Sequence, residues 1–176
     1  MTQPHTIPDD PHSIGRGDHM NGATLKTVRE ALGLSVPWFA GFCAVQERTV
    51  RHWESGRNTV PISVATAIRE FEKAAAELVI KIVDQARSVI AKHGLPTGTI
   101  PVVRYADDED LSHYQPNMAG LPTTFHAAAI ARARWALACD VEIEARMLDA
   151  GAYESWRRSI NQQDSPGLRA QFVALD

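Results

Sequence analysis

The sequence has few cysteines and no long hydrophobic run. Its 176 residues include only two cysteines, Cys43 and Cys139, too few for a disulfide framework or a zinc-ligand set. No apolar stretch reaches the roughly 18–20 residues that cross a bilayer, and no charged-then-apolar start is typical of a secretion signal. We therefore expect a cytoplasmic protein without a membrane partner, in which both cysteines are small apolar residues of the interior.

Catalytic patterns are also missing. No Gly-rich phosphate loop occurs, and Glu142 and Glu144 would lie on different faces of the helix that we expect there, so they form no carboxylate pair. His113 and His126 lie near an acidic run but lack the spacing of a nucleophile, base and orienting group. We expect both histidines to be solvated, and we predict a protein that is not an enzyme and uses no cofactor.

The first 20 residues differ in composition from the rest of the chain. They hold three prolines, three histidines and three aspartates, with few sizeable apolar side chains. Such a segment cannot bury enough surface to offset its chain entropy, so we predict a disordered arm over 1–20. His5, His12 and His19 recur every seven residues, but a disordered arm does not preorganise metal ligands, and we predict no metal site.

The charge is unevenly distributed. The formal net charge is −3 for the whole chain, which argues against a general nucleic-acid coat. Residues 21–60, however, contain five lysines or arginines and three glutamates, a net charge of +2. This distribution suits a protein in which one region meets an anion while the rest remains soluble.

Residues 21–94 read as three short helices followed by one long helix. Asn21 is a good N-cap for the first helix, which Gly33 ends, and Ser35 caps the second. The third is expected from Glu47 to Ser55. Apolar residues then recur every three or four positions over 63–94, which predicts a single connecting helix. The far half of that helix needs a second surface, from the rest of this chain or from another copy.

Residues 95–176 read as a C-terminal domain for dimerisation or another interaction. Residues 100–105 predict a short edge strand because of the early proline, and the acidic residues 107–110 predict the cap of a short helix. A long helix is expected over about 124–148, then a last helix over 154–160 before a polar, frayed end. The fold class is therefore mainly α with a short β element.

The stretch from Leu34 to Gly56 resembles the Cro/XRE-type helix-turn-helix family. The positions that carry the resemblance are Leu34, Ser35, Phe39, Ala40, Val45, Thr49, Val50, Trp53, Glu54, Ser55 and Gly56, with Pro61 a few residues later. It implies a lambda-repressor-like helix-turn-helix domain over 21–62 whose third helix enters the DNA major groove.

The third helix has distinct inner and outer faces. Val50 and Trp53 are three residues apart and are expected to turn inward, which leaves the charged positions on the outer face. Arginine suits bidentate contact with guanine, and glutamate can accept from cytosine. Residues at the helix start and just past its end would hold phosphates. The predicted DNA-binding residues are Gln46, Glu47, Arg48, Arg51, His52, Arg57 and Asn58.

The sequence departs from the family pattern at several positions. Ala44 stands where the family usually has glycine, and Val36 where a glutamine commonly grips a phosphate. Trp38 and Phe42 form an aromatic i, i+4 pair at positions that are usually polar. We expect the later domain, a partner subunit or another protein to cover this pair, or the chain's own loops to shield it.

A wider resemblance covers roughly residues 21–137. This part of the chain is similar to the small family that contains the anti-CRISPR-associated autorepressors. The similar features are Asn21, the helix that follows it, the segment from Trp53 to Pro61, the long helix and the strand near Val103. The resemblance implies a homodimer that binds an inverted repeat in double-stranded DNA and represses its own operon. Two alternatives stay open: an antitoxin whose C-terminal region binds a toxin, and an interaction module that does not read DNA.

Overall fold

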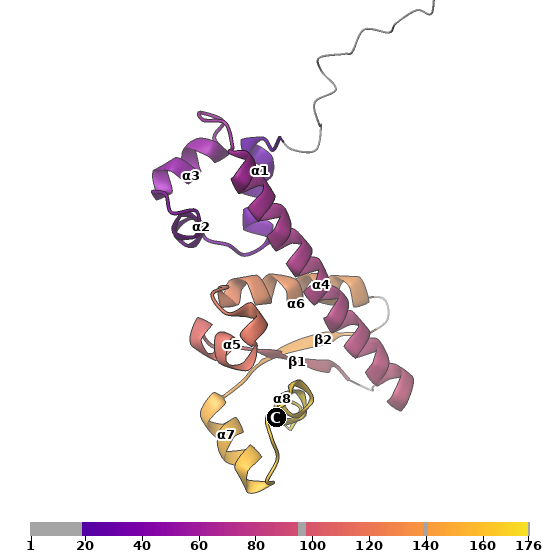
Figure 1. Ribbon diagram of the computed structural model, residues 1–176. Helices are drawn as coiled ribbons and strands as arrows, with labels where there is room; N and C mark the ends of the chain where they lie inside the picture. The colour runs from indigo at the N-terminus through magenta and orange to yellow at the C-terminus, as the bar shows by residue number, and fades with distance from the viewer. Residues whose placement is uncertain (1–18, 95–97, 139–140, 176) are drawn as a thin grey trace, which may run out of the picture.

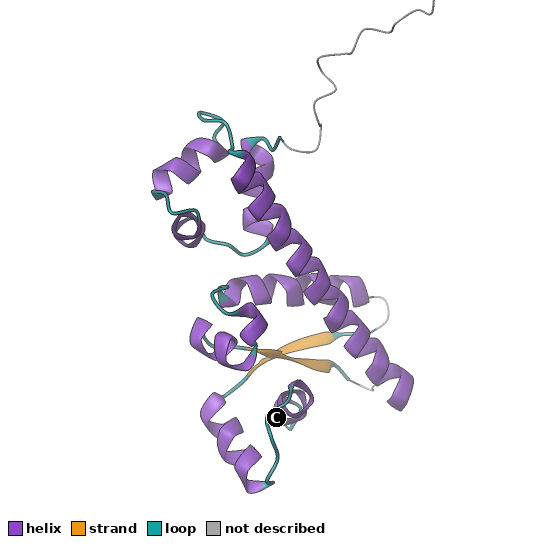
Figure 2. Cartoon of the chain, viewed as in Figure 1, coloured by secondary structure: helices purple, strands orange, loops and turns teal. Residues whose placement is uncertain are grey.

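The protein is mainly α-helical, as its sequence predicts. The computed structural model describes residues 19–94, 98–138 and 141–175, which form eight α-helices, one short 3-10 helix and a two-stranded sheet (Figure 2). Most of the predicted arm, including His5 and His12, lies outside the described residues, and so does Cys139.

The first three helices form a compact unit, called here the three-helix unit. Asn21 Oδ1 accepts a hydrogen bond from Thr24 N–H (2.7 Å) and Ser35 Oγ accepts one from Trp38 N–H (3.2 Å), so both predicted N-caps are confirmed. Gly33 follows the first helix with φ +69°, as a C-terminal glycine does. The helices are α1 (Gly22–Ala31), α2 (Val36–Phe42) and α3 (Glu47–Glu54).

The turn between α2 and α3 contains a strained residue. Ala44 has φ +54°, and Val45 N–H donates to Ala40 O at 3.0 Å to close the turn. A left-handed conformation costs an L-residue roughly 1–2 kcal/mol, which glycine avoids. Ala44, which stands where the helix-turn-helix family usually has glycine, therefore occupies the position of this turn where glycine fits best.

Helix α4 (Ile62–His93) is the predicted long helix and joins two halves of the molecule (Figure 1). Its first half contributes Val64 and Ile68 to the core of the three-helix unit. Its second half buries Ile82 and Ala86 against α6 and the sheet. In the far half, Ile82, Val83 and Ala86 are therefore covered by the remainder of this same chain, whereas Val89 stays 42% exposed.

The region after α4 is a β-α-β unit rather than a strand followed by one long helix. Strands β1 (Ile100–Arg104) and β2 (Ile143–Met147) pair in parallel, with Ile100 opposite Ile143. Between them lie α5 (Asp108–Tyr114), the 3-10 turn η1 (Pro116–Met118) and α6 (Thr123–Leu137). The prediction of a helix over 124–148 is wrong in its second half, where the chain leaves α6 and forms β2. Val141 and Ile143 are β-branched and alternate with polar residues, which favours a strand.

The C-terminal end is folded rather than frayed. After α7 (Ala150–Ser159), helix α8 (Pro166–Val173) packs below β1 (Figure 1). Arg169 of α8 is buried and bonds to Asp164, and the hydroxyl of Tyr153 donates to the same carboxylate at 2.7 Å. Burial and this bond raise the pKa of Tyr153. The predicted last helix therefore begins earlier, at Ala150, and a further helix follows it.

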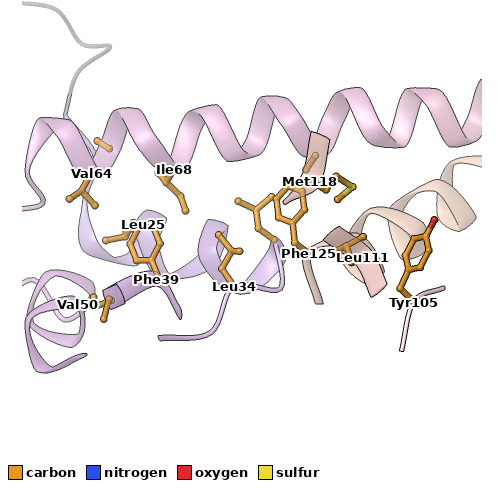
Figure 3. Close-up of a cluster of buried hydrophobic side chains, with 14 of the residues drawn as sticks. Leu25, Leu34, Phe39, Val50, Val64, Ile68, Tyr105, Leu111, Met118 and Phe125 are labelled. Atoms are coloured by element: carbon orange, nitrogen blue, oxygen red, sulfur yellow. The ribbon is translucent and has the colours of Figure 1, made fainter. Parts of the chain in front are cut away.

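One hydrophobic cluster runs through both halves. It extends along α4 from Leu25, Phe39 and Val64 to Phe125 and Tyr105 (Figure 3). The start of α6 lies directly under the three-helix unit: the Thr124 hydroxyl donates to Gly33 O, and Arg132 Nη2 donates to Ala31 O at 3.0 Å. The orientation of α1–α3 relative to the sheet is therefore fixed by α6 as well as by α4.

Candidate nucleic-acid interface

Helix α3 is held to the core by one side. Val50 is completely buried and Trp53 nearly so, and both belong to the cluster that contains Phe39. Positions three apart share a helix face, so the predicted inward direction of these two side chains is confirmed. Cys43, at the end of α2, is only half-buried, and this burial raises the pKa of its thiol.

The seven predicted DNA-binding residues lie on α3, at its N-cap and in the loop that follows it. Five are exposed: Gln46, Arg48, Arg51, Arg57 and Asn58. The other two, Glu47 and His52, are half-buried on α3. The side of α3 opposite to Val50 and Trp53 is therefore open to solvent, at the end of the molecule remote from α7 and α8 (Figure 1).

Two of these residues pair with each other. Arg51 Nη2 lies 2.8 Å from Glu47 Oε2, one turn earlier on α3, and both side chains are about half exposed. An exposed pair of this spacing contributes only about 0.3–0.5 kcal/mol. Arg51 is therefore aligned along α3 by a contact weak enough to be exchanged for a base or phosphate.

A second ion pair lies behind α3, and sequence reasoning missed it. Arg29 Nε donates to Glu54 Oε1 at 2.6 Å, and Arg29 Nη1 donates to Leu34 O, also at 2.6 Å. The side chains of Arg29 and Glu54 are only 6% and 7% exposed. The sequence could have indicated that Arg29 is buried, because Arg29 shares a helix face with the apolar Leu25 and Leu32.

The charge left at the surface of this region is still positive. Because Arg29 and Glu54 neutralise each other internally, residues 21–60 expose four cationic and two acidic side chains. Lys26 lies on α1, whereas three of the four cations gather on α3 and the next loop. These three are Arg48, Arg51 and Arg57.

The aromatic pair on α2 is partly covered by the chain itself. Trp38 stacks on Phe42 with ring centroids 5.7 Å apart, and Phe71 of α4 meets both rings edge-on. Trp38 Nε1 also donates to Gly120 O at 3.2 Å, just before α6. The later part of the chain therefore contacts Trp38, which is one of the alternatives that the sequence left open, while Phe42 keeps 51% of its surface exposed.

We expected His126 to be solvated, but the structure places it in α6 with its side chain buried. It is 5% exposed, its ring centre is 5.3 Å from that of Tyr105, and its Nδ1 has no hydrogen-bond partner among the described residues. Burial, aided by the charge of Arg104, lowers the pKa of His126 to about 4. The ring is therefore neutral at physiological pH. His113 lies on α5 and is exposed, as predicted.

Glu144 lies in β2 and Glu142 just before it, so the expectation that they occupy opposite faces of a helix is wrong. Alternate residues of an extended chain share a side, yet these carboxylates bind different arginines, Arg134 and Arg146, each at 2.9 Å. Hydrogen bonds from Thr99 and Arg146 lower the pKa of Glu144. Within the described ranges, no group of three potential ligands is placed to hold a metal.

Comparison with known proteins assigns no family to this chain. A scan against models of protein families and a search of curated proteins both gave no match. None of the helices within residues 19–94, 98–138 and 141–175 combines the length and apolarity needed to cross a membrane.

Proposed function

We propose that this protein is a sequence-specific double-stranded DNA-binding regulator that acts as a homodimeric repressor. One observation carries the proposal: α3 is anchored through Val50 and Trp53 while Arg48 and Arg51 project from its open side. The preceding helix, the tight turn at Ala44 and α3 correspond to a helix-turn-helix, whose second helix enters the major groove. The resemblance to Cro/XRE proteins, drawn from residues 34–56, supports the same assignment.

Roles for the individual side chains follow from their chemistry. Arg48 and Arg51 can make bidentate contacts with guanine O6 and N7, and Glu47 can accept from a cytosine amine. Arg57 and Asn58, in the loop past α3, can reach the phosphates that fix the position of the helix. Base contacts would then give specificity and phosphate contacts would give affinity.

A homodimer follows from the limits of one recognition helix. Each good base contact discriminates by about 1–3 kcal/mol, and α3 has only eight residues with which to make such contacts. Two copies on an inverted repeat would double the contacts, with half-site centres about 10 base pairs or a multiple apart. The contacts of Thr124 and Arg132 with the three-helix unit would hold each α3 at a fixed place within the dimer.

Selection of bound sequences from random DNA duplexes tests the proposal. We expect enrichment of an inverted repeat, and loss of that enrichment when Arg48→Ala and Arg51→Ala are combined. The matched control combines Lys81→Ala and Arg87→Ala, which removes the same charge from exposed positions of α4. If no sequence is enriched at moderate salt, or if the α3 variant keeps its operator affinity, α3 does not read DNA.

A further inference from the structure

The two edges of the sheet differ: a proline lies at the outer edge of β1, whereas the outer edge of β2 has none. Ile100 N–H donates to Glu142 O, and Leu148 N–H donates to Arg104 O. In each strand, the backbone N–H and C=O groups of the even-numbered residues therefore point toward the other strand. Pro101 therefore lies on the outer side of β1, where it supplies no N–H donor. A proline at an edge discourages the addition of another strand.

The outer edge of β2 has no such protection. The same alternation turns the backbone N–H and C=O groups of Ile143, Ala145 and Met147 away from β1. The sheet has no further strand within the described residues, and none of these groups has another backbone partner there. A row of unpaired groups along an edge is a template for a strand from another chain.

An open groove accompanies this edge. It has a volume of about 630 Å³ and lies between β2 and α6, with Ala127, Ala131 and Ile143 among its lining residues. Met147 of β2, which lines the groove, is 57% exposed, and Trp135, one turn after the lining residue Ala131 on α6, is 87% exposed. The edge therefore combines unpaired backbone with apolar surface.

The charges of β2 indicate what this edge binds. Glu144 and Arg146 flank Ala145 and lie on the side of the sheet that faces α8, since Arg146 Nη1 donates to Val173 O at 2.9 Å. If a second β2 runs antiparallel with the twofold axis at Ala145, Glu144 of each copy stands opposite Arg146 of the other. In the ladder between the two β2 strands, Glu144 and Arg146 form pairs without hydrogen bonds, where facing side chains approach most closely.

Neighbouring twofold registers lack this match. An axis at Glu144 places two glutamates opposite each other, and an axis at Arg146 places two arginines opposite each other. An axis at Ile143 sets Glu142 against Glu144. Like charges directly across a strand pair are destabilising, so the sequence of β2 is self-complementary in one arrangement.

We propose that a second copy of this chain pairs with β2 across Ala145, so that the two sheets join into one of four strands. The odd-numbered residues of β2 then exchange their backbone hydrogen bonds with the partner strand. Met147 comes to lie opposite Ile143 of the second copy on the α6 side, and both residues line the groove. The inference deepens the proposed function, because it supplies the interface of the homodimer on which that function rests.

Paired charge variants of the full chain test this interface by mass measurement in solution without DNA. Glu144→Arg alone and Arg146→Glu alone each place like charges across the axis, and we expect each to raise the dimer dissociation constant at least about tenfold. Mixing the two variants should restore a dimer that contains one copy of each. The contact between residues 144 and 146 within one chain stays broken in both copies, so recovery on mixing reports contacts between chains.

Hydrogen exchange adds a measurement that the folding of a variant does not affect. In the wild-type dimer, the amides of Ile143, Ala145 and Met147 should be protected from exchange. In a monomer, protection within β2 should be limited to the amides of Glu144 and Arg146, which donate to β1. A monomeric wild type, fast exchange at the odd positions, or a dimer unaffected by either charge variant would overturn the interface. Because no DNA is present, these results are separate from failure to bind an operator.

Discussion

Arg29 Nε lies 2.6 Å from Glu54 Oε1, and this buried pair fastens α1 to the last turn of α3. Removal of one partner leaves an uncompensated charge in the interior, which typically destabilises by 3–5 kcal/mol. We expect Arg29→Met to lower the free energy of unfolding by about that amount in urea denaturation. Glu54→Gln should cost less, since the amide oxygen can still accept from the guanidinium.

The exposed pair of Lys26 and Glu30 on α1 is the matched control for this prediction. These groups are 4.0 Å apart and more than half exposed, so Lys26→Met should change the stability by less than about 1 kcal/mol. Equal effects of the substitutions at Lys26 and Arg29 would contradict a structural role for the buried pair.

A glycine allows α1 and α3 to approach each other. A Cβ added to Gly22 would collide with Trp53 O and lie 2.8 Å from Glu54 O, both of which are backbone atoms. Gly22→Ala should therefore separate the two helices and destabilise the protein by more than about 2 kcal/mol. The midpoint of thermal unfolding measures this effect.

Gly41 provides the comparison within the same unit. It lies in α2, and a Cβ there would meet nothing within 4 Å. Gly41→Ala should raise the stability by about 0.5–1 kcal/mol through helix propensity. If both alanine substitutions shift the midpoint in the same direction, the close approach at Gly22 does not control the packing.

Local signals were sufficient to predict the three-helix unit and α4. Asn21, Ser35 and Gly33 mark helix ends through their own backbone preferences, and Val50 and Trp53 reveal the inner face of α3 by their spacing. Such information is contained in a few neighbouring residues, so the sequence carries it without knowledge of the remaining fold.

The second half of the molecule depends on contacts that are distant in sequence. Helical periodicity through Ala138 concealed the change to β2, which forms only because Ile143 finds Ile100 more than 40 residues earlier. Helix α8 is held by buried Arg169, which pairs with Asp164 and lies over the ring of Tyr114. The burial of His126 likewise results from the packing of α6, which its neighbours in sequence do not reveal.

His126 should make the stability depend on pH. Its pKa is about 4 in the folded protein, lowered by burial and by Arg104, against about 6.5 in an unfolded chain. Between these values the unfolded chain binds more protons, so the contribution is complete above about pH 6.5 and is lost as the pH falls toward 4. We expect a loss of about 3 kcal/mol over this range from this residue alone.

Urea denaturation at several pH values, compared between wild type and His126→Leu, isolates this contribution from that of the carboxylates. The slope of stability against pH between 4 and 6.5 should be smaller in the variant. His113→Asn, which removes an exposed histidine of α5, serves as the control for the loss of a histidine side chain. Parallel slopes for wild type and His126→Leu would show that His126 does not carry the pH dependence.

Arg57 should contribute affinity without sequence preference. It is exposed in the loop after α3, where Asn58 N–H donates to His52 O at 3.2 Å and holds that loop against the helix end. A phosphate contact there releases counterions, so each lost contact reduces the slope of log affinity against log salt by about 0.9. Binding of Arg57→Ala to an operator and to an unrelated duplex over a range of salt should therefore weaken in parallel, with a shallower slope for both. If only the operator affinity falls, Arg57 contacts a base and belongs with Arg48 and Arg51.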